Sequence, residues 1–121
     1  MQIIIPITPV TKKTHQRIVK AKGRLMVIPS KQYKEYEKAC AEFIPQIPFN
    51  TFDCPVNVKC LFYMPTHRRV DLVNLEESIL DVLVKYSVIS DDNSNIVVSM
   101  DGSRVLYSKE NPRTEIEITE L

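Results

Sequence analysis

The stretch from Arg68 to Asp92 holds the residues of this chain that are best suited to chemistry. Its sequence is RRVDLVNLEESILDVLVKYSVISDD, in which Asp71 follows a basic triplet and the pair Asp91–Asp92 closes the stretch. Arginine side chains bind phosphate, and clustered carboxylates bind a divalent cation such as Mg²⁺. Together these groups predict metal-dependent cleavage of a phosphodiester bond.

A single amphipathic helix is expected between these acidic groups, over residues 72–86. The face that we expect to be buried carries Leu72, Leu75, Ile79, Val82, Leu83 and Tyr86. The opposite face carries Asn74, Ser78, Asp81 and Lys85, of which Asp81 and Lys85 have the spacing of an i,i+4 ion pair. The helix spans roughly 20 Å, so its two ends cannot meet within one straight helix. They can meet if the Asp91–Asp92 loop folds back, or if a second copy of the chain brings its own helix alongside.

The remaining pattern predicts one α+β domain over residues 1–121, with two main helices packed on a mixed sheet. Strands are expected at residues 2–7, 25–28, 55–63, 95–107 and 113–119. The first helix is expected to begin at the N-cap Ser30 and to end before Pro45. Its apolar residues are Tyr33, Tyr36, Cys40, Phe43 and Ile44. The dipeptide Asp101–Gly102 predicts a bulge within its strand rather than a hairpin turn.

Residues 8–24 are rich in basic residues, lack apolar periodicity and are predicted to form a long loop. The first forty residues carry nine Lys or Arg and two Glu, a balance of +7. Residues 71–121 carry four basic and eleven acidic residues, a balance of −7. A basic half joined to an acidic half suits a polyanion-binding surface beside a cation site, or simply the solvated faces of a globular protein.

Several functions are disfavoured by composition. The three cysteines form no CxxC motif, so we expect reduced, buried thiols rather than a zinc site. No run of 18 apolar residues is present, which predicts that the chain does not cross a membrane. The opening MQIIIPITPV has no basic segment of the kind that begins a signal peptide.

The run DLVNLEESILDVLVKYSVISDD resembles the core of the RusA family of Holliday junction resolvases. That family has a D-x-D-N-L start, a helix with an inner Asp-x-Leu, and a double Asp about twenty residues on. The matching positions here are Asp71, Asn74, Leu75, Asp81, Leu83, Asp91 and Asp92. The opening IPITPVTKK and the closing PRTEIEI also resemble the family, so the likeness spans nearly the whole chain.

The resemblance implies a homodimeric, Mg²⁺-dependent endonuclease, with Mn²⁺ as an alternative cation, that cuts four-way DNA junctions. Asp71 and Asp92 would hold the metal near the dimer interface, and Asp91 would support them or shape the turn. It also implies a bacterial cytoplasm and a phage or prophage origin. Two positions depart from the family: Val73 replaces its second aspartate, and Glu77 replaces its lysine. Glu77 is a candidate compensating carboxylate, and a junction-binding homodimer with impaired catalysis is the alternative function.

DNA contacts are expected from two basic groups. Arg68 and Arg69 lie next to the acidic site and are well placed to bind phosphate. Lys12, Lys13 and Arg17 are either DNA-backbone contacts or part of a solvated loop. Asp71 is also a good N-cap, and Asp91–Asp92–Asn93 is also a good Asx turn, so each carboxylate has a structural alternative. A dimer that does not bind nucleic acid is the third and weakest reading.

Overall fold

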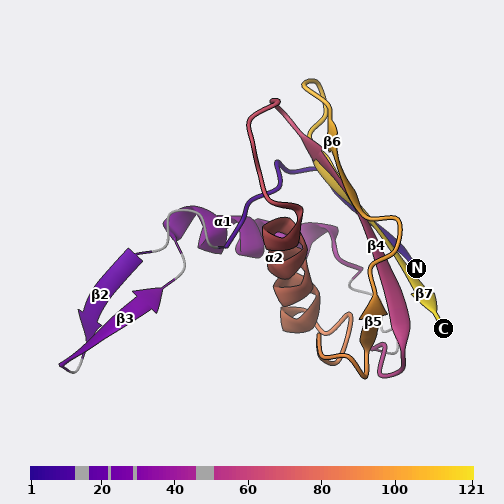
Figure 1. The fold of residues 1–121 in the computed structure, drawn as a ribbon, viewed down its shortest axis with the longest axis horizontal. Helices are drawn as coiled ribbons and strands as arrows, with labels where there is room; N and C mark the ends of the chain where they lie inside the picture. The colour runs from indigo at the N-terminus through magenta and orange to yellow at the C-terminus, as the bar shows by residue number, and fades with distance from the viewer. Residues whose placement is uncertain (13–16, 22, 29, 46–50) are drawn as a thin grey trace.

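A mixed sheet forms the centre of the fold (Figure 1). The computed structural model describes residues 1–12, 17–21, 23–28, 30–45 and 51–121. The strands of the sheet are β1 (Gln2–Ile5), β4 (Val56–Met64), β5 (Val97–Ser99), β6 (Arg104–Tyr107) and β7 (Arg113–Glu120). β7 lies between β1 and β4 and is antiparallel to both, whereas β5 and β6 run parallel to β4 on its other side. The predicted α+β domain with a mixed sheet is therefore confirmed.

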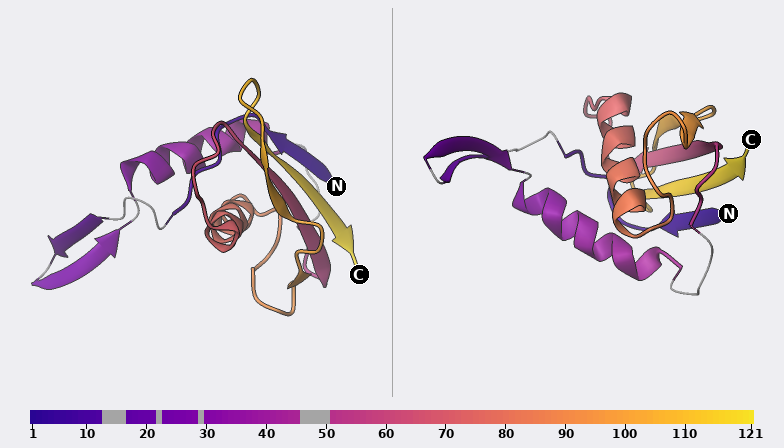
Figure 2. Two further views of the ribbon diagram at one scale, coloured as in Figure 1. Left: turned by 45° about the horizontal axis from the view of Figure 1, so that its top comes forward. Right: turned by 90° about the horizontal axis from the view of Figure 1, so that it is seen from below.

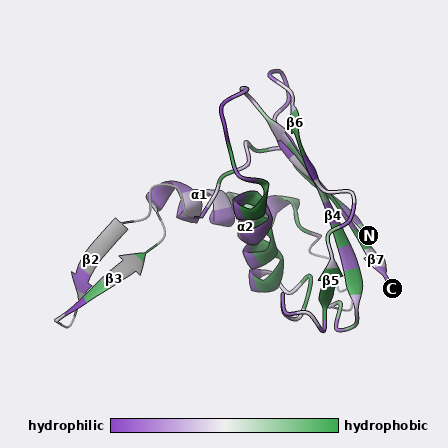
Figure 3. Ribbon diagram, in the orientation of Figure 1, coloured by the Kyte–Doolittle hydropathy of each residue, from purple (hydrophilic) through white to green (hydrophobic). Residues whose placement is uncertain are grey.

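The two helices, α1 (Lys31–Cys40) and α2 (Leu72–Lys85), cover the same face of the sheet (Figure 2). Every second residue of β4, from Val56 to Phe62, is buried beneath them, as the alternating pattern predicts. α2 contributes four apolar side chains to this core: Leu75, Ile79, Val82 and Leu83. Figure 3 shows hydrophobic residues along both α2 and β5. None of the described residues forms a helix on the opposite face of the sheet.

The first helix begins as predicted and ends earlier than predicted. The Tyr33 backbone N–H donates to the Ser30 hydroxyl at 3.1 Å, so Ser30 is the N-cap. α1 stops at Cys40, and the chain tightens into a 3₁₀ turn, η1 (Ala41–Phe43). The tighter turn breaks the α-helical spacing, which leaves Phe43 38% exposed while Ile44 is buried. The expectation that Phe43 and Ile44 continue the helical spacing up to Pro45 was wrong.

The predicted loop at residues 8–24 was also wrong in part. Its second half forms β2 (Arg17–Ala21), which pairs antiparallel with β3 (Arg24–Ile28) in a separate two-stranded sheet. β-branched residues favour strands, and Gly23 supplies the positive φ of 74° that the reversal requires. Basic residues between the apolar ones hide this pattern in the sequence. The β2–β3 ribbon stands away from the sheet and helices in all views (Figures 1 and 2).

The outer edge of β4 is paired with an interrupted strand. β5 and β6 follow one another along β4, and residues 100–103 bulge out between them. Gly102 has a φ of 87°, which suits glycine, and an added Cβ would lie 3.1 Å from the Lys59 side chain. The chain does not reverse here, so the predicted bulge describes it better than a hairpin.

The three cysteines give a test of this core. Cys40 and Cys60 are buried and Cys54 is half-buried. Burial raises the pKa of the Cys40 thiol to about 11 and that of Cys60 to about 12. Because the thiolate is the reactive species, we expect Cys54 alone to react with Ellman's reagent in the native protein and all three to react in denaturant. Rapid modification of Cys60 without denaturant would contradict this packing.

Candidate active site and nucleic-acid interface

Asp71 stands at the start of α2 with its carboxylate at the surface. It occupies the N-cap position, and its carbonyl accepts the Leu75 N–H at 3.1 Å. Its side chain makes no capping hydrogen bond to the helix backbone and instead accepts the Asn74 amide at 3.2 Å. The backbone of Asp71 therefore begins the helix, whereas its carboxylate oxygens do not satisfy the helix N–H groups.

Asp91 and Asp92 lie in an exposed turn after the other end of α2. The Asp91 carboxylate accepts the Asp92 backbone N–H at 2.7 Å and the Asn93 side-chain amide at 3.1 Å. The Asn93 side chain in turn accepts the Asn95 backbone N–H at 2.9 Å, which is the pattern of an Asx turn. Partial desolvation raises the pKa of the Asp92 carboxyl, and its hydrogen bond with Asp91 and the nearby charge of Asp81 raise it further. Asp91 therefore orders the turn. In addition to desolvation, the neighbouring carboxylates of Asp91 and Asp81 make the Asp92 carboxyl harder to ionise, which raises its pKa.

The two acidic groups do not meet in one copy of the chain. Figure 1 shows the start of α2 and the turn that follows its end at opposite ends of the helix. Among the described residues, no three His, Cys, Asp or Glu side chains converge in a way that could hold a metal ion. The Asp91–Asp92 loop therefore does not fold back to Asp71, and a single protomer does not fit a divalent cation between them.

Lys12, one of the candidate DNA contacts, lies against α2. Its ammonium group pairs with Asp81 at 2.8 Å, and this hydrogen bond raises the pKa of Lys12. Its backbone N–H donates to the Ser78 hydroxyl at 2.6 Å. Ser78 is only 1% exposed, so the prediction that it lies on an open helix face was wrong. The N-terminal segment covers that face.

The predicted Asp81–Lys85 pair is also replaced. Lys85 reaches across to α1 and pairs with Glu37 at 2.6 Å. Asp81 and Lys85 therefore each pair with a residue distant in the sequence rather than with each other. Lys13 lies outside the described residues, and the backbone of Arg17 lies in β2.

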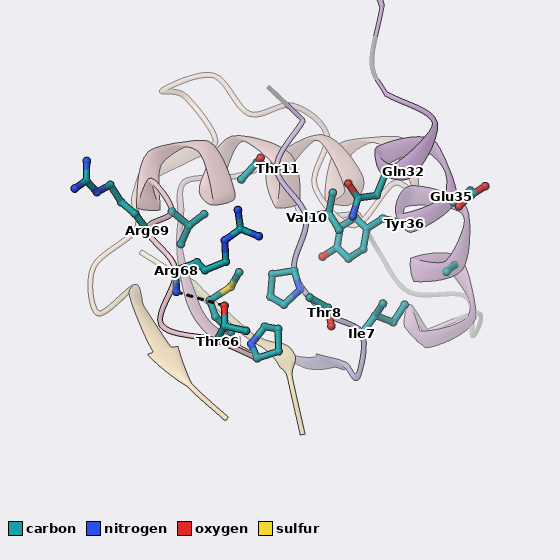
Figure 4. Close-up of a pocket in the computed structure, with 15 residues that line it drawn as sticks. Ile7, Thr8, Val10, Thr11, Gln32, Glu35, Tyr36, Thr66, Arg68 and Arg69 are labelled. Carbon is teal, nitrogen blue, oxygen red and sulfur yellow. Dashed lines mark hydrogen bonds between the residues drawn. The ribbon is translucent and has the colours of Figure 1, made fainter. Parts of the chain in front are cut away.

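A groove of about 570 Å³ lies beside Asp71. Its walls are residues 7–11, one side of α1 and residues 64–70, which connect β4 to α2. Figure 4 shows the Arg68 side chain reaching over the groove, whereas Arg69 points away from it. The Arg68 backbone N–H donates to the Thr66 hydroxyl at 3.3 Å. Within the described parts of the chain neither guanidinium forms an ion pair, so both can bind phosphate.

The face of α2 that points away from the sheet is unusually apolar. Val73, Leu80 and Val84 fall within about 40° of one another at 100° per residue. Val73 is 69% exposed, and the other two are only partly buried. Glu77 lies between them on the same face. Leu80 and Val84 also contact the buried core cluster, so Val73 is the exposed apolar side chain of this face.

Comparison with known proteins defines the class of this molecule. Residues 6–119 of the 121-residue chain match the family described as Endodeoxyribonuclease RusA. A search of curated proteins finds no matching relative. The chain is thus placed in a class of enzymes that cut DNA internally. More narrowly, it belongs to the RusA family of Holliday junction endonucleases, as its central motif predicts. No helix of the described residues is long and apolar enough to cross a membrane.

The contact between Lys12 and α2 predicts a difference between two substitutions. Ser78→Ala leaves the partly buried Lys12 N–H without its acceptor, which we expect to cost about 1–3 kcal/mol of unfolding free energy. Asp81→Asn weakens a partly exposed ion pair and should cost under about 1 kcal/mol. Urea denaturation of the two variants measures both losses. An equal or larger loss for Asp81→Asn would show that the ion pair, rather than the buried hydrogen bond, anchors the segment.

Proposed function

We propose that two copies of this chain form a homodimer that cuts four-way DNA junctions, with each active site built from both protomers. Membership of the RusA family supports the substrate and reaction. The separation of the acidic groups supports the shared site, because α2 holds Asp71 and Asp92 apart in one copy. The cation that these carboxylates would hold together is Mg²⁺, or Mn²⁺ in its place.

The outward face of α2 supports an antiparallel pairing of the two helices. Val73 and Val84 lie near opposite ends of this face, with Leu80 between them. In an antiparallel pair, Val73 of one copy packs beside Val84 of the other, at an interaxial distance of about 8–10 Å. The start of each α2 then lies beside the end of its partner, which brings Asp71 of one protomer toward the Asp91–Asp92 turn of the other.

The DNA strand is proposed to run past Arg68 and Arg69. Both side chains lie beside the start of α2, and Arg68 reaches over the groove next to Asp71 (Figure 4). A bound phosphodiester would therefore have arginine on one side and carboxylate on the other. The β2–β3 ribbon, which carries the exposed Lys20 and Arg24, is a second candidate contact with the DNA backbone.

A second candidate function is junction binding without efficient cleavage. The observation that favours it is Val73, which is 69% exposed at the position where the family has its second aspartate. Valine cannot bind a cation. Glu77 is partly buried and lies one turn further along the same face. It is the residue that could compensate for the lost carboxylate.

Mixing two inactive variants tests the shared site. Asp71→Asn and Asp92→Asn should each abolish cleavage of a synthetic four-way junction in Mg²⁺ while leaving binding intact or tighter, because a repulsive charge is removed. In a mixed dimer, one of the two sites has Asp71 from one protomer and Asp92 from the other, and is complete. We therefore expect co-refolded variants to recover single-strand nicking.

Sites contained within one protomer give a different outcome. Every site of the mixed dimer would then carry one defect, and no activity would return. Asp101→Asn, which changes an exposed aspartate in the bulge, is the matched control and should cleave like the wild type. Wild-type cleavage by either Asp71→Asn or Asp92→Asn would remove that residue from the site.

Val73→Asp separates the two candidate functions. If the missing carboxylate limits catalysis, this variant should bind the cation more tightly or cut faster, and Val73→Asn, which lacks the charge, should not. A carboxylate in the first turn of α2 is favoured by the helix dipole by about 0.3–1 kcal/mol, so stability should not confound the comparison. If Val73→Asp changes nothing and Glu77→Lys reduces cleavage, Glu77 has taken over the role.

A further inference from the structure

An exposed pair of stacked rings lies near the start of α2. The rings of His67 and Tyr107 have centroids 3.9 Å apart and planes inclined by 25°. His67 belongs to the connection between β4 and α2, and Tyr107 is the last residue of β6. Both residues are exposed, and Tyr107 keeps 45% of its surface in solvent. We call this pair the aromatic platform.

The platform contributes little to the folded core. Neither ring belongs to the buried cluster between the sheet and the helices. Tyr107 pairs with Met64 through the backbone, so the register of β6 does not depend on its side chain. Because both residues are exposed, the stacked pair is open to contact by a ligand.

The charges around the platform favour an anionic partner. Arg68 and Arg69 follow His67 directly, and Lys109 lies two residues after Tyr107. A second ring on the same end of the sheet is already covered by a cation, because the Arg113 guanidinium lies 3.7 Å from the centre of the Tyr63 ring. Acidic residues here include Asp71, Glu110 and Glu115, of which Glu115 is paired with Arg113 at 2.6 Å.

We propose that the aromatic platform stacks an unpaired nucleobase, while Arg68 and Arg69 hold the adjoining phosphates. Every nucleobase has a π-face that can stack on an exposed ring, and basic residues beside such rings follow the backbone. In continuous duplex DNA the bases are already stacked and paired, so the platform has no ligand there. This proposal rests on the proposed junction binding. Stacking of an unpaired base would make the protein bind branched DNA more tightly than continuous duplex.

Affinity measured against salt tests this role. Tyr107→Ala and His67→Ala should each weaken binding to a four-way junction by on the order of 10-fold and leave duplex binding unchanged. Their salt dependence should match the wild type, because stacking releases no counterions. Arg68→Ala should weaken both DNA forms and reduce the salt slope by about 0.9. Tyr107→Phe keeps the ring and should bind like the wild type, as should Val105→Ala on the same strand.

A fluorescent base gives an independent readout. 2-Aminopurine placed at the junction crossover should be quenched when the wild type binds and should stay bright with Tyr107→Ala at saturating protein. Wild-type junction affinity and quenching by Tyr107→Ala would overturn the platform but leave the proposed function standing. A parallel loss of duplex and junction affinity by Tyr107→Ala would also overturn it. Failure of the wild type to bind any junction would reject the proposed function and the platform together.

Discussion

A straight helix holds its two ends apart, and the arrangement of this protein depends on that constraint. α2 has 14 residues and is therefore about 21 Å long. Its inner stripe is fixed against β4, so the helix cannot bend to bring Asp71 and Asp92 together. In the proposed homodimer the second carboxylate would come from another copy, whose α2 would pack against the face that carries Val73, Leu80 and Val84.

The N-terminal segment forms one wall of the groove, and its contacts with α2 hold it in place. Lys12 attaches this segment through its backbone to Ser78 and through its side chain to Asp81. The preceding residues 7–11 are thereby held opposite the 64–70 connection that carries Arg68. The ion pair is partly exposed and contributes modestly, whereas the buried hydrogen bond is costly to lose. Lys12, which the sequence suggests as a DNA contact, thus also holds one wall of the groove in place.

The sequence predicts the helices and strands that have a strong helical or period-two pattern. It does not predict side-chain positions that depend on contacts between segments distant in the sequence. The alternation in β4, the apolar spacing of α2 and the Ser30 cap are local features, and the structure confirms them. Ser78 and the partners of Asp81 and Lys85 depend on segments distant in the sequence, so local spacing misplaced them. The His67–Tyr107 stack was missed for the same reason. Asp71, Asp91 and Asp92 were selected by their motif, and the expected helix length already kept its two ends apart. The course of the loop after the helix could not be predicted from local sequence.

The β2–β3 ribbon is expected to be less stable than the main sheet. Within the described part of the chain the β2–β3 sheet has two strands, and a lone hairpin of this size is only marginally stable in water. Its opening free energy is therefore far below that of the sheet, and its amides should exchange with solvent through small fluctuations. A partner that captures the ribbon must supply the entropy cost of ordering it. The ribbon can thus contact a large surface of a partner while the cost of ordering it keeps that binding weak enough to reverse. Reversible binding suits the proposed enzyme, which has to release its DNA product.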